Sequence, residues 1–230
     1  MRRHTDSIPG WLRRGMVLLG LLVWLPALGC GDDDSGLPPA GVDCADLSPQ
    51  PAIVTDIDET LTTSDEEFIQ QVLEPDYVPA HREGSVALIR GFYERGYLVL
   101  YLTARSEALE LMDGTSAREA TEAWLNQLGF PMDPDRTRLI LSEEATSGDE
   151  TAAYKRDALL GLEAEGWDFE YAFGNAVTDI QGYAAAGIPA DHTYIIGEEA
   201  ADATAVGVQG EGWTTTIEEV LDPQGRVCDF

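Results

Sequence analysis

The stretch AIVTDIDETLTT, residues 52–63, decides the fold, because a short apolar run leads directly into two aspartates. A strand that ends at Asp56 and Asp58 delivers two carboxylates to the carboxyl edge of a sheet, where open α/β folds bind ligands. Alternate strand residues point the same way, so one carboxylate can attack phosphorus while the other protonates the leaving oxygen. The competing interpretation is an acidic turn after an edge strand. The pattern favours phosphoryl transfer with magnesium, a cation that prefers carboxylate and phosphate oxygens.

Two further elements carry groups that suit phosphate. The apolar run 97–102 predicts a buried strand ending at Thr103, whose hydroxyl can hold a phosphate oxygen or merely cap the next helix. Lys155 opens the amphipathic segment 155–162 in a chain with very few lysines. Its ammonium suits the neutralisation of phosphate and carboxylate together, and the competing interpretation is a solvated surface lysine.

A third element, residues 171–179, is an apolar strand followed by Gly174, Asn175 and an acid. The glycine permits a tight turn, and Asn175 supplies a neutral oxygen. Asp179 supplies a second metal carboxylate from the first turn of the next helix. Asp179 can also stabilise the positive end of that helix, and the two interpretations are compatible.

Together these elements resemble the haloacid dehalogenase superfamily of phosphatases, whose fingerprint is Asp-x-Asp-x-Thr, a strand-terminal Thr or Ser, a Lys, and a Gly-Asp or Gly-Asn run ending in Asp. The resemblance is closest to the catalytic domain of the lipin-type phosphatidate phosphatases, over roughly residues 50–200. The matching segments are 56–65 (DIDETLTTSD), 101–105 (YLTAR) and 173–175 (FGN), with Asp179, Tyr183 and 187–189 (GIP).

The resemblance implies a complete site. Its residues would be catalytic Asp56, Asp58, Thr103 and Lys155, substrate-binding Thr60, Thr103 and Arg105, and magnesium-binding Asp56, Asp58, Asn175 and Asp179. Asp56 would be the nucleophile, and Asp58 the general acid and base with its backbone carbonyl on the metal. Thr60 would fix the loop, and Lys155 would steady the aspartyl-phosphate. The substrate implied is phosphatidate or a similar lipid phosphate.

Two departures from the lipin pattern bear on function. Glu59 stands where lipins usually have glycine, and we expect no counterpart of the amino-terminal lipin domain with its membrane-binding helix. Related lipid-transfer proteins carry a version of the domain that has lost its aspartates and only binds lipid. Because Asp56 and Asp58 are both present, we expect an enzyme. The alternatives are a phosphatase for soluble periplasmic phosphomonoesters and a non-catalytic lipid-binding lipoprotein.

The amino terminus has the pattern of an export signal. Four arginines precede the apolar stretch 16–25, which is too short to span a membrane, and Pro-Ala-Leu-Gly-Cys follows at 26–30. The last residues resemble a bacterial lipobox, so residues 1–29 are expected to be a signal peptide and Cys30 the diacylated first residue. A non-lipidated signal cut nearby is the alternative, and Arg13-Arg14 leaves the twin-arginine route open. We therefore expect a lipid-anchored protein of the bacterial cell envelope, facing the periplasm or otherwise outside the cytoplasm.

Of the remaining cysteines, Cys44 precedes the first catalytic strand and Cys228 lies at the very end of the chain. In an oxidising compartment we expect them to form a disulfide that joins the two ends of the domain. Two free buried thiols are the competing interpretation.

The order of apolar segments predicts one α/β domain over residues 51–230, preceded by a flexible tether at 30–50. Strands are expected at 52–57, 97–103, 138–142, 170–174 and 192–196, and helices at 84–95, 116–128, 153–164 and 178–186. Their alternation predicts a doubly wound, Rossmann-like parallel sheet of haloacid dehalogenase type. The insertions 64–82 and 111–116 are too short for a large cap domain.

The charge of the chain limits its partners. Its formal net charge is −28, and removal of residues 1–29 leaves 10 basic and 41 acidic residues, a formal charge of −31. Such a surface repels polynucleotides and anionic lipids at low salt. Nucleic acid is not an expected partner, approach to a membrane would depend on the lipid anchor, and a monomer is expected.

Overall fold

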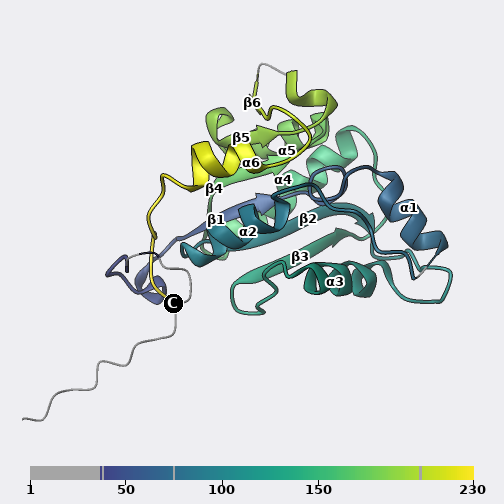
Figure 1. Cartoon of the computed structure of the whole chain (residues 1–230), viewed down its shortest axis with the longest axis horizontal. Helices are drawn as coiled ribbons and strands as arrows, with labels where there is room; N and C mark the ends of the chain where they lie inside the picture. Colours follow the sequence, from purple (N-terminus) through teal and green to yellow (C-terminus); the bar gives the residue numbers. More distant parts are fainter. Residues whose placement is uncertain (1–36, 38, 75, 202–203) are drawn as a thin grey trace, which may run out of the picture. The chain divides into compact units, whose positions relative to one another are not determined.

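A parallel sheet of six strands in the order β3-β2-β1-β4-β5-β6 forms the centre of the protein (Figure 1). The computed structural model describes residues 37, 39–74, 76–201 and 204–230. The strands are β1 (Gln50–Thr55), β2 (Leu98–Ser106), β3 (Thr137–Ser142), β4 (Trp167–Gly174), β5 (Thr193–Ile195) and β6 (Val206–Gly207). All five neighbouring pairs are parallel. Because the strand order reverses between β1 and β4, the switch point that binds ligands in such sheets lies at the carboxyl end of β1.

The apolar run of β1 makes it a central strand. Val54 pairs with Leu100 of β2 on one side and with Ala172 of β4 on the other. Ile53 packs into the core on one face of the sheet, and Ala52 and Val54 pack into the core on the other. A strand buried on both faces needs apolar residues at successive positions rather than alternate ones, which is the pattern seen here.

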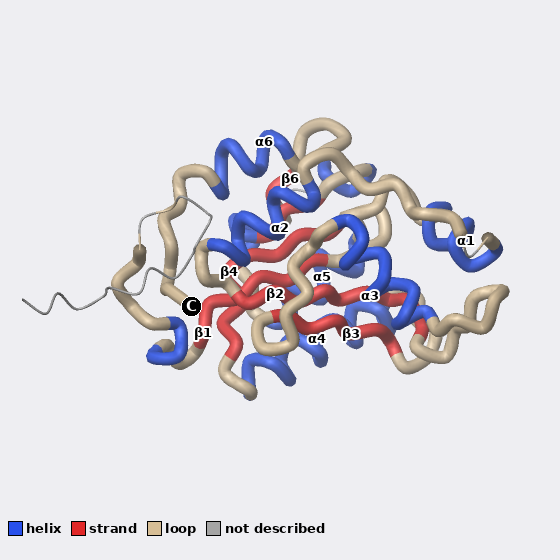
Figure 2. The backbone as a smooth tube through the Cα atoms, turned by 60° about the horizontal axis from the view of Figure 1, so that its bottom comes forward, coloured by secondary structure: helices blue, strands red, loops and turns tan. Residues whose placement is uncertain are grey.

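Helices cover both faces of the sheet (Figure 2). The helices α2 (Ser85–Glu94) and α3 (Ala117–Leu128) contribute Phe92 and Trp124 to the core that contains Ile53. The helices α4 (Asp149–Ala164) and α5 (Val177–Ala186) contribute Leu159 and Tyr183 to the opposite core. The expectation of a doubly wound α/β fold is therefore confirmed.

Several expected boundaries were wrong. Strand β1 ends at Thr55 rather than at residue 57, so Asp56 and Asp58 belong to the following loop. Helix α4 begins at Asp149, which places Lys155 inside the helix instead of at its start. The short elements α1 (Glu66–Leu73), β6 and α6 (Thr214–Thr216), with the π-helical turn Ile217–Leu221, were not expected. In the described part of the segment between β1 and α2, α1 is the one helix, and no large cap domain is inserted there.

The two ends of the described domain are joined. Cys44 and Cys228 form the expected disulfide. Residues 30–50 were expected to be a flexible tether without structure. Within this segment, however, Cys44–Asp46 form a short 3₁₀ helix. The Asp229 carboxylate also accepts hydrogen bonds from the backbone N–H groups of Ala40 and Gly41. The hydrogen bonds to the Asp229 carboxylate and the Cys44–Cys228 disulfide hold this segment in place.

The expected signal peptide at 1–29 and the expected lipidation site Cys30 lie outside the described residues. Within the part of the chain that the structure does describe, we find no helix with the length and apolar character needed to cross a membrane.

Candidate active site

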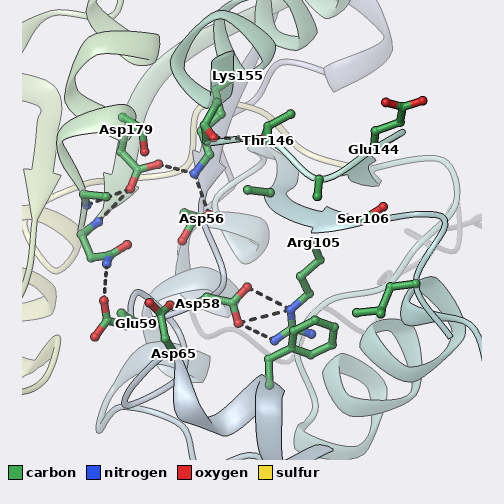
Figure 3. Close-up of a pocket in the computed structure, with 18 of the residues that line it drawn as sticks. Asp56, Asp58, Glu59, Asp65, Arg105, Ser106, Glu144, Thr146, Lys155 and Asp179 are labelled. Atoms are coloured by element: carbon green, nitrogen blue, oxygen red, sulfur yellow. Dashed lines mark hydrogen bonds and ion pairs between the residues drawn. The ribbon is translucent and has the colours of Figure 1, made fainter. Parts of the chain in front are cut away.

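Two aspartates follow the central strand at the carboxyl edge of the sheet. Asp56 continues the pairing of β1, because its N–H donates to the Phe173 carbonyl at 2.9 Å, and its side chain is buried. The intervening Ile57 lies in the core, and Leu61 N–H donates to its carbonyl at 2.8 Å, closing a tight loop. Asp56 and Asp58 therefore both line one cavity of about 870 Å³, shown in Figure 3.

Lys155 lies between two buried carboxylates. Its Nζ donates to Asp56 Oδ1 at 2.7 Å and also to Asp179 Oδ1 (Figure 3). It is the only lysine of the chain. Helices α4 and α5 can approach closely here because Gly182 has no side chain; a Cβ at that position would lie 3.0 Å from Lys155 Cβ. The close packing of these helices positions the ammonium.

The electrostatics of this group are dominated by burial. Burial raises the pKa of Asp56 to about 7; Asp179 and Asp58 add to the shift, and the neighbouring Lys155 opposes it. Burial acts against the charge of Lys155, but Asp179 and Asp56 outweigh it and raise the pKa of the ammonium. Lys155 is therefore a permanent cation at neutral pH, while a second positive charge would further favour ionised Asp56.

The turn between β4 and α5 orients Asp179 and Asn175. Asp179 Oδ2 accepts the N–H groups of Asn175 and Ala176, both at 3.0 Å, so it caps the helix as well as facing Lys155. Gly174 is required at this turn because a Cβ there would lie 2.6 Å from the Asp179 side chain. Asn175 Oδ1 accepts from Thr60 at 3.0 Å, and its Nδ2 donates to Glu59 Oε2 at 3.1 Å.

Thr60 and Thr103 are buried, and neither lines the cavity. The Thr60 hydroxyl lies 3.2 Å from Asp56 Oδ2 and bridges to Asn175, a position that suits its expected role in fixing the loop. The Thr103 hydroxyl donates to Asp58 Oδ2 at 3.2 Å. In this arrangement both hydroxyls contact the site's own side chains instead of facing a substrate.

Arg105 is paired with Asp58. Its Nη2 lies 2.7 Å from Asp58 Oδ1, and its Nε lies 2.9 Å from Oδ2. Its Nη1 donates to Thr121 of α3 at 2.9 Å, and its guanidinium carbon lies 3.9 Å from the centre of the Phe68 ring on α1. Arg105 is 4 % exposed. Its polar atoms are thus used within the protein, although sequence reasoning assigned it to the substrate.

The donor atoms around the cavity suit magnesium. Asp56, Asp58, Asn175 and Asp179 all line it and offer oxygen ligands, the set that this cation prefers. The space that Gly174 leaves for the Asp179 carboxylate is part of that arrangement. In this structure Lys155 bridges two of the carboxylates, and no group of three or more His, Cys, Asp or Glu side chains among the described residues is gathered in a metal-ligand arrangement.

Sequence reasoning missed two side chains of the site. Phe68 lies on the unexpected helix α1, whose signal was the apolar spacing of Phe68, Ile69, Val72 and Leu73 behind an acidic first turn. Glu59 was noted only as a departure from glycine; its backbone is left-handed, with φ 53°, and its carboxylate binds Asn175. The positive φ explains why glycine is common at such a position.

Comparisons with known proteins gave one family and several distant structures. The model of the family described as "PITM 1-3, LNS2 domain" matches residues 53–197. The tungstate-bound class C acid phosphatase from Bacillus anthracis has 17% sequence identity and a TM-score of 0.40, covering 59% of this chain and 55% of that one. A chain of the Pnkp1/Rnl/Hen1 RNA repair complex has 18% identity and a TM-score of 0.46, covering 67% and 45%. This chain thus spans about half the length of these structures. No curated protein matches the sequence.

Proposed function

The chain belongs to the LNS2 domain family, which shares the haloacid dehalogenase-type phosphatase fold. From this premise we propose that the protein is a magnesium-dependent phosphomonoester hydrolase. The observation that carries the proposal is the meeting of Asp56, Lys155 and Asp179 at the wall of a cavity that Asp58 also lines. A retired phosphatase that only binds lipid has no need for both aspartates. Their presence supports catalysis over binding alone.

The reaction follows from the positions of two carboxylates. An Asp56 oxygen attacks phosphorus and forms a P–O bond, while the bond to the ester oxygen breaks and Asp58 gives that oxygen a proton. Asp58 then takes a proton from water, which attacks the aspartyl-phosphate at phosphorus and releases phosphate and the Asp56 carboxylate. Lys155 holds Asp56 in place and neutralises negative charge in both steps.

The side chains of Asp56, Asn175 and Asp179 and the backbone carbonyl of Asp58 would hold the magnesium ion. When bound, the ion supplies positive charge that offsets the repulsion between the carboxylates and the phosphate. The oxygen-only donor set supports this assignment.

The favoured substrate is phosphatidate or a similar lipid phosphate, and we propose that Cys30 anchors the enzyme outside the cytoplasm of a bacterial cell. Support for the substrate comes from the lipin resemblance and from the apolar residues of the cavity wall, Phe68, Ile69, Ala104, Ala108 and Leu109. Support for the location comes from the lipobox-like sequence at 26–30 and from the disulfide, a bond typical of oxidising compartments. The acidic charge of the chain favours anchoring over electrostatic attraction to anionic lipid.

The test is phosphate release by the full chain in detergent, with magnesium or EDTA, from phosphatidate micelles and from a soluble nucleotide monophosphate. We expect magnesium-dependent release from phosphatidate that Asp56→Asn abolishes. Release from the nucleotide alone would keep the mechanism and reject the lipid substrate. Tight phosphatidate binding without release from either compound would replace the proposal with a lipid-binding lipoprotein.

A further inference from the structure

We propose that Phe68 and Arg105 are positioning residues for Asp58, so that helix α1 controls the orientation of the catalytic acid. The inference rests on the proposed function, in which Asp58 protonates the leaving oxygen. It assigns Arg105 to the acid and not to the substrate, and it gives α1 a part in the chemistry.

Arg105 contacts Asp58 directly. The guanidinium meets the carboxylate side-on, with Nη2 to Oδ1 at 2.7 Å and Nε to Oδ2 at 2.9 Å (Figure 3). Thr103 adds a donor to Oδ2 at 3.2 Å. Two parallel hydrogen bonds fix the plane of a carboxylate, which a single contact does not. Asp58 side-chain exposure is 20%, so its orientation toward the cavity is set by these neighbours and not by tight packing.

Arg105 is itself held by neighbouring side chains. Its Nη1 donates to Thr121 on α3, and its guanidinium carbon lies over the Phe68 ring, 3.9 Å from the ring centre. A guanidinium held between an aromatic face and a hydroxyl has little freedom to rotate. Phe68 is therefore the contact through which α1 restrains the arginine.

Helix α1 forms part of the cavity wall. Phe68 lines the cavity together with Asp58 and Arg105. The end of α1 is tied to the loop that follows β2, because Met112 N–H donates to the Val72 carbonyl at 3.0 Å. A ligand that moves α1 would therefore move the ring beside Arg105, and through Arg105 the carboxylate of Asp58.

The dependence of the hydrolysis rate on the leaving group shows whether Phe68 and Arg105 position Asp58 or only stabilise the fold. Protonation by a general acid matters greatly for a strongly basic alkoxide and little for a weakly basic nitrophenolate. A misplaced Asp58 slows the hydrolysis of an alkyl phosphate more than that of p-nitrophenyl phosphate. Loss of folded protein slows both equally.

The experiment measures kcat/KM, which reports the step in which the leaving group departs, for glycerol phosphate and for p-nitrophenyl phosphate with saturating magnesium. It uses the full chain and the variants Phe68→Leu, Arg105→Lys and Asp58→Asn. Leu73→Ala is the matched control, since Leu73 is on the same helix, is 57% exposed and does not line the cavity. We expect the alkyl-to-aryl ratio of kcat/KM to fall about tenfold in Phe68→Leu and Arg105→Lys and further in Asp58→Asn, within the range that general acids contribute. The control keeps the wild-type ratio.

Two results would overturn the inference and can be told apart. If Asp58→Asn lowers the ratio but Phe68→Leu and Arg105→Lys leave it unchanged, Asp58 is the acid and only the positioning role is rejected. If the wild type releases no phosphate, or Asp56→Asn retains full activity, the proposed function fails and the positioning role fails with it.

Discussion

Lys155 Nζ lies 2.7 Å from Asp56 Oδ1, although the two residues are 99 positions apart in the sequence. The same ammonium donates to Asp179, so one cation is shared by two buried carboxylates. Both the stability of this edge of the sheet and the proposed chemistry depend on that charge balance.

Replacement of Lys155 by methionine is expected to remove activity and to destabilise the protein. The substitution leaves two buried carboxylates without a cationic partner, a change that typically costs about 3–5 kcal/mol. Chemical denaturation at pH 8 in EDTA measures the loss. Arg156→Met is the control, because Arg156 is the next residue on α4 and pairs with exposed Asp157. A Lys155→Met protein as stable as the control would contradict the importance of this ion pair.

The stability of the metal-free protein is expected to depend on pH through Asp56. Its pKa in the folded protein is about 7, above the ordinary value of 3.8, so the folded state holds the proton more tightly than the unfolded state does. The resulting stabilisation is complete below about pH 4 and is lost as the pH rises through about 7. The Asn side chain does not titrate, so the difference in unfolding free energy between wild type and Asp56→Asn isolates this effect. In EDTA, that difference should shift in favour of the variant between pH 4 and pH 8; a shift in the other direction would refute the assignment.

Magnesium is expected to raise the melting temperature of the wild type. An ion that binds only the folded state stabilises it by about 2.7 kcal/mol at a concentration of about 100 times its Kd. Asp179→Asn removes one ligand charge and should abolish most of the shift. Scans at equal ionic strength with sodium chloride control for screening, and an equal shift in both proteins would place the ion elsewhere.

Glu59→Gly is expected to relieve backbone strain and, at the same time, to weaken magnesium binding. Glycine relieves the left-handed backbone at φ 53°, a gain of about 1 kcal/mol, but removes the carboxylate that accepts from Asn175 Nδ2. Magnesium affinity should fall about tenfold, the lower end of the effect seen when a group that orients a metal ligand is removed. Titration calorimetry measures it. Glu59→Gln keeps an acceptor oxygen and should bind magnesium like the wild type; tighter binding by the glycine variant would show that Glu59 does not orient Asn175.

Loss of the disulfide is expected to affect stability and not catalysis. The Cys44–Cys228 link closes a loop of 184 positions, for which the chain-entropy model gives about 5 kcal/mol. Cys44 lies before the first residue of β1, whereas Asp56 follows its last. The double variant Cys44→Ala/Cys228→Ala should unfold at lower denaturant concentration yet keep wild-type kcat well below its melting temperature. A reduced kcat under those conditions would indicate coupling along β1.

Sequence reasoning succeeded where the signal is local and strong. The apolar runs before Asp56, Thr103 and Gly174 located three neighbouring strands and placed their carboxyl ends at one edge. It missed α1, although the apolar residues of this helix have helical spacing. It also missed β6, because a two-residue strand buries too little apolar surface to impose a period. It also misplaced the start of α4, whose first turn is polar and acidic.

The contacts of Arg105 had no signal in the sequence. Its spacing after β2 was compatible with a substrate ligand, yet in the structure its donors bind Asp58 and Thr121. The partners of the Arg105 side chain include Phe68 on α1 and Thr121 on α3, two helices that are separate from β2 in the sequence. The resemblance to known phosphatases could not supply that information either.

By itself the sequence determined that this is a doubly wound α/β domain with two aspartates after its central strand. The reason is that the hydrophobic period of a segment and the residues that end a strand depend only on neighbouring positions in the sequence. Only the tertiary structure decided that Lys155 joins Asp56 to Asp179, and that Arg105 holds Asp58 against the ring of Phe68. The physical reason is that local backbone preference selects strands and helices, whereas the partner of a buried charge is selected by whichever opposite charge the packed helices and loops bring within hydrogen-bond distance.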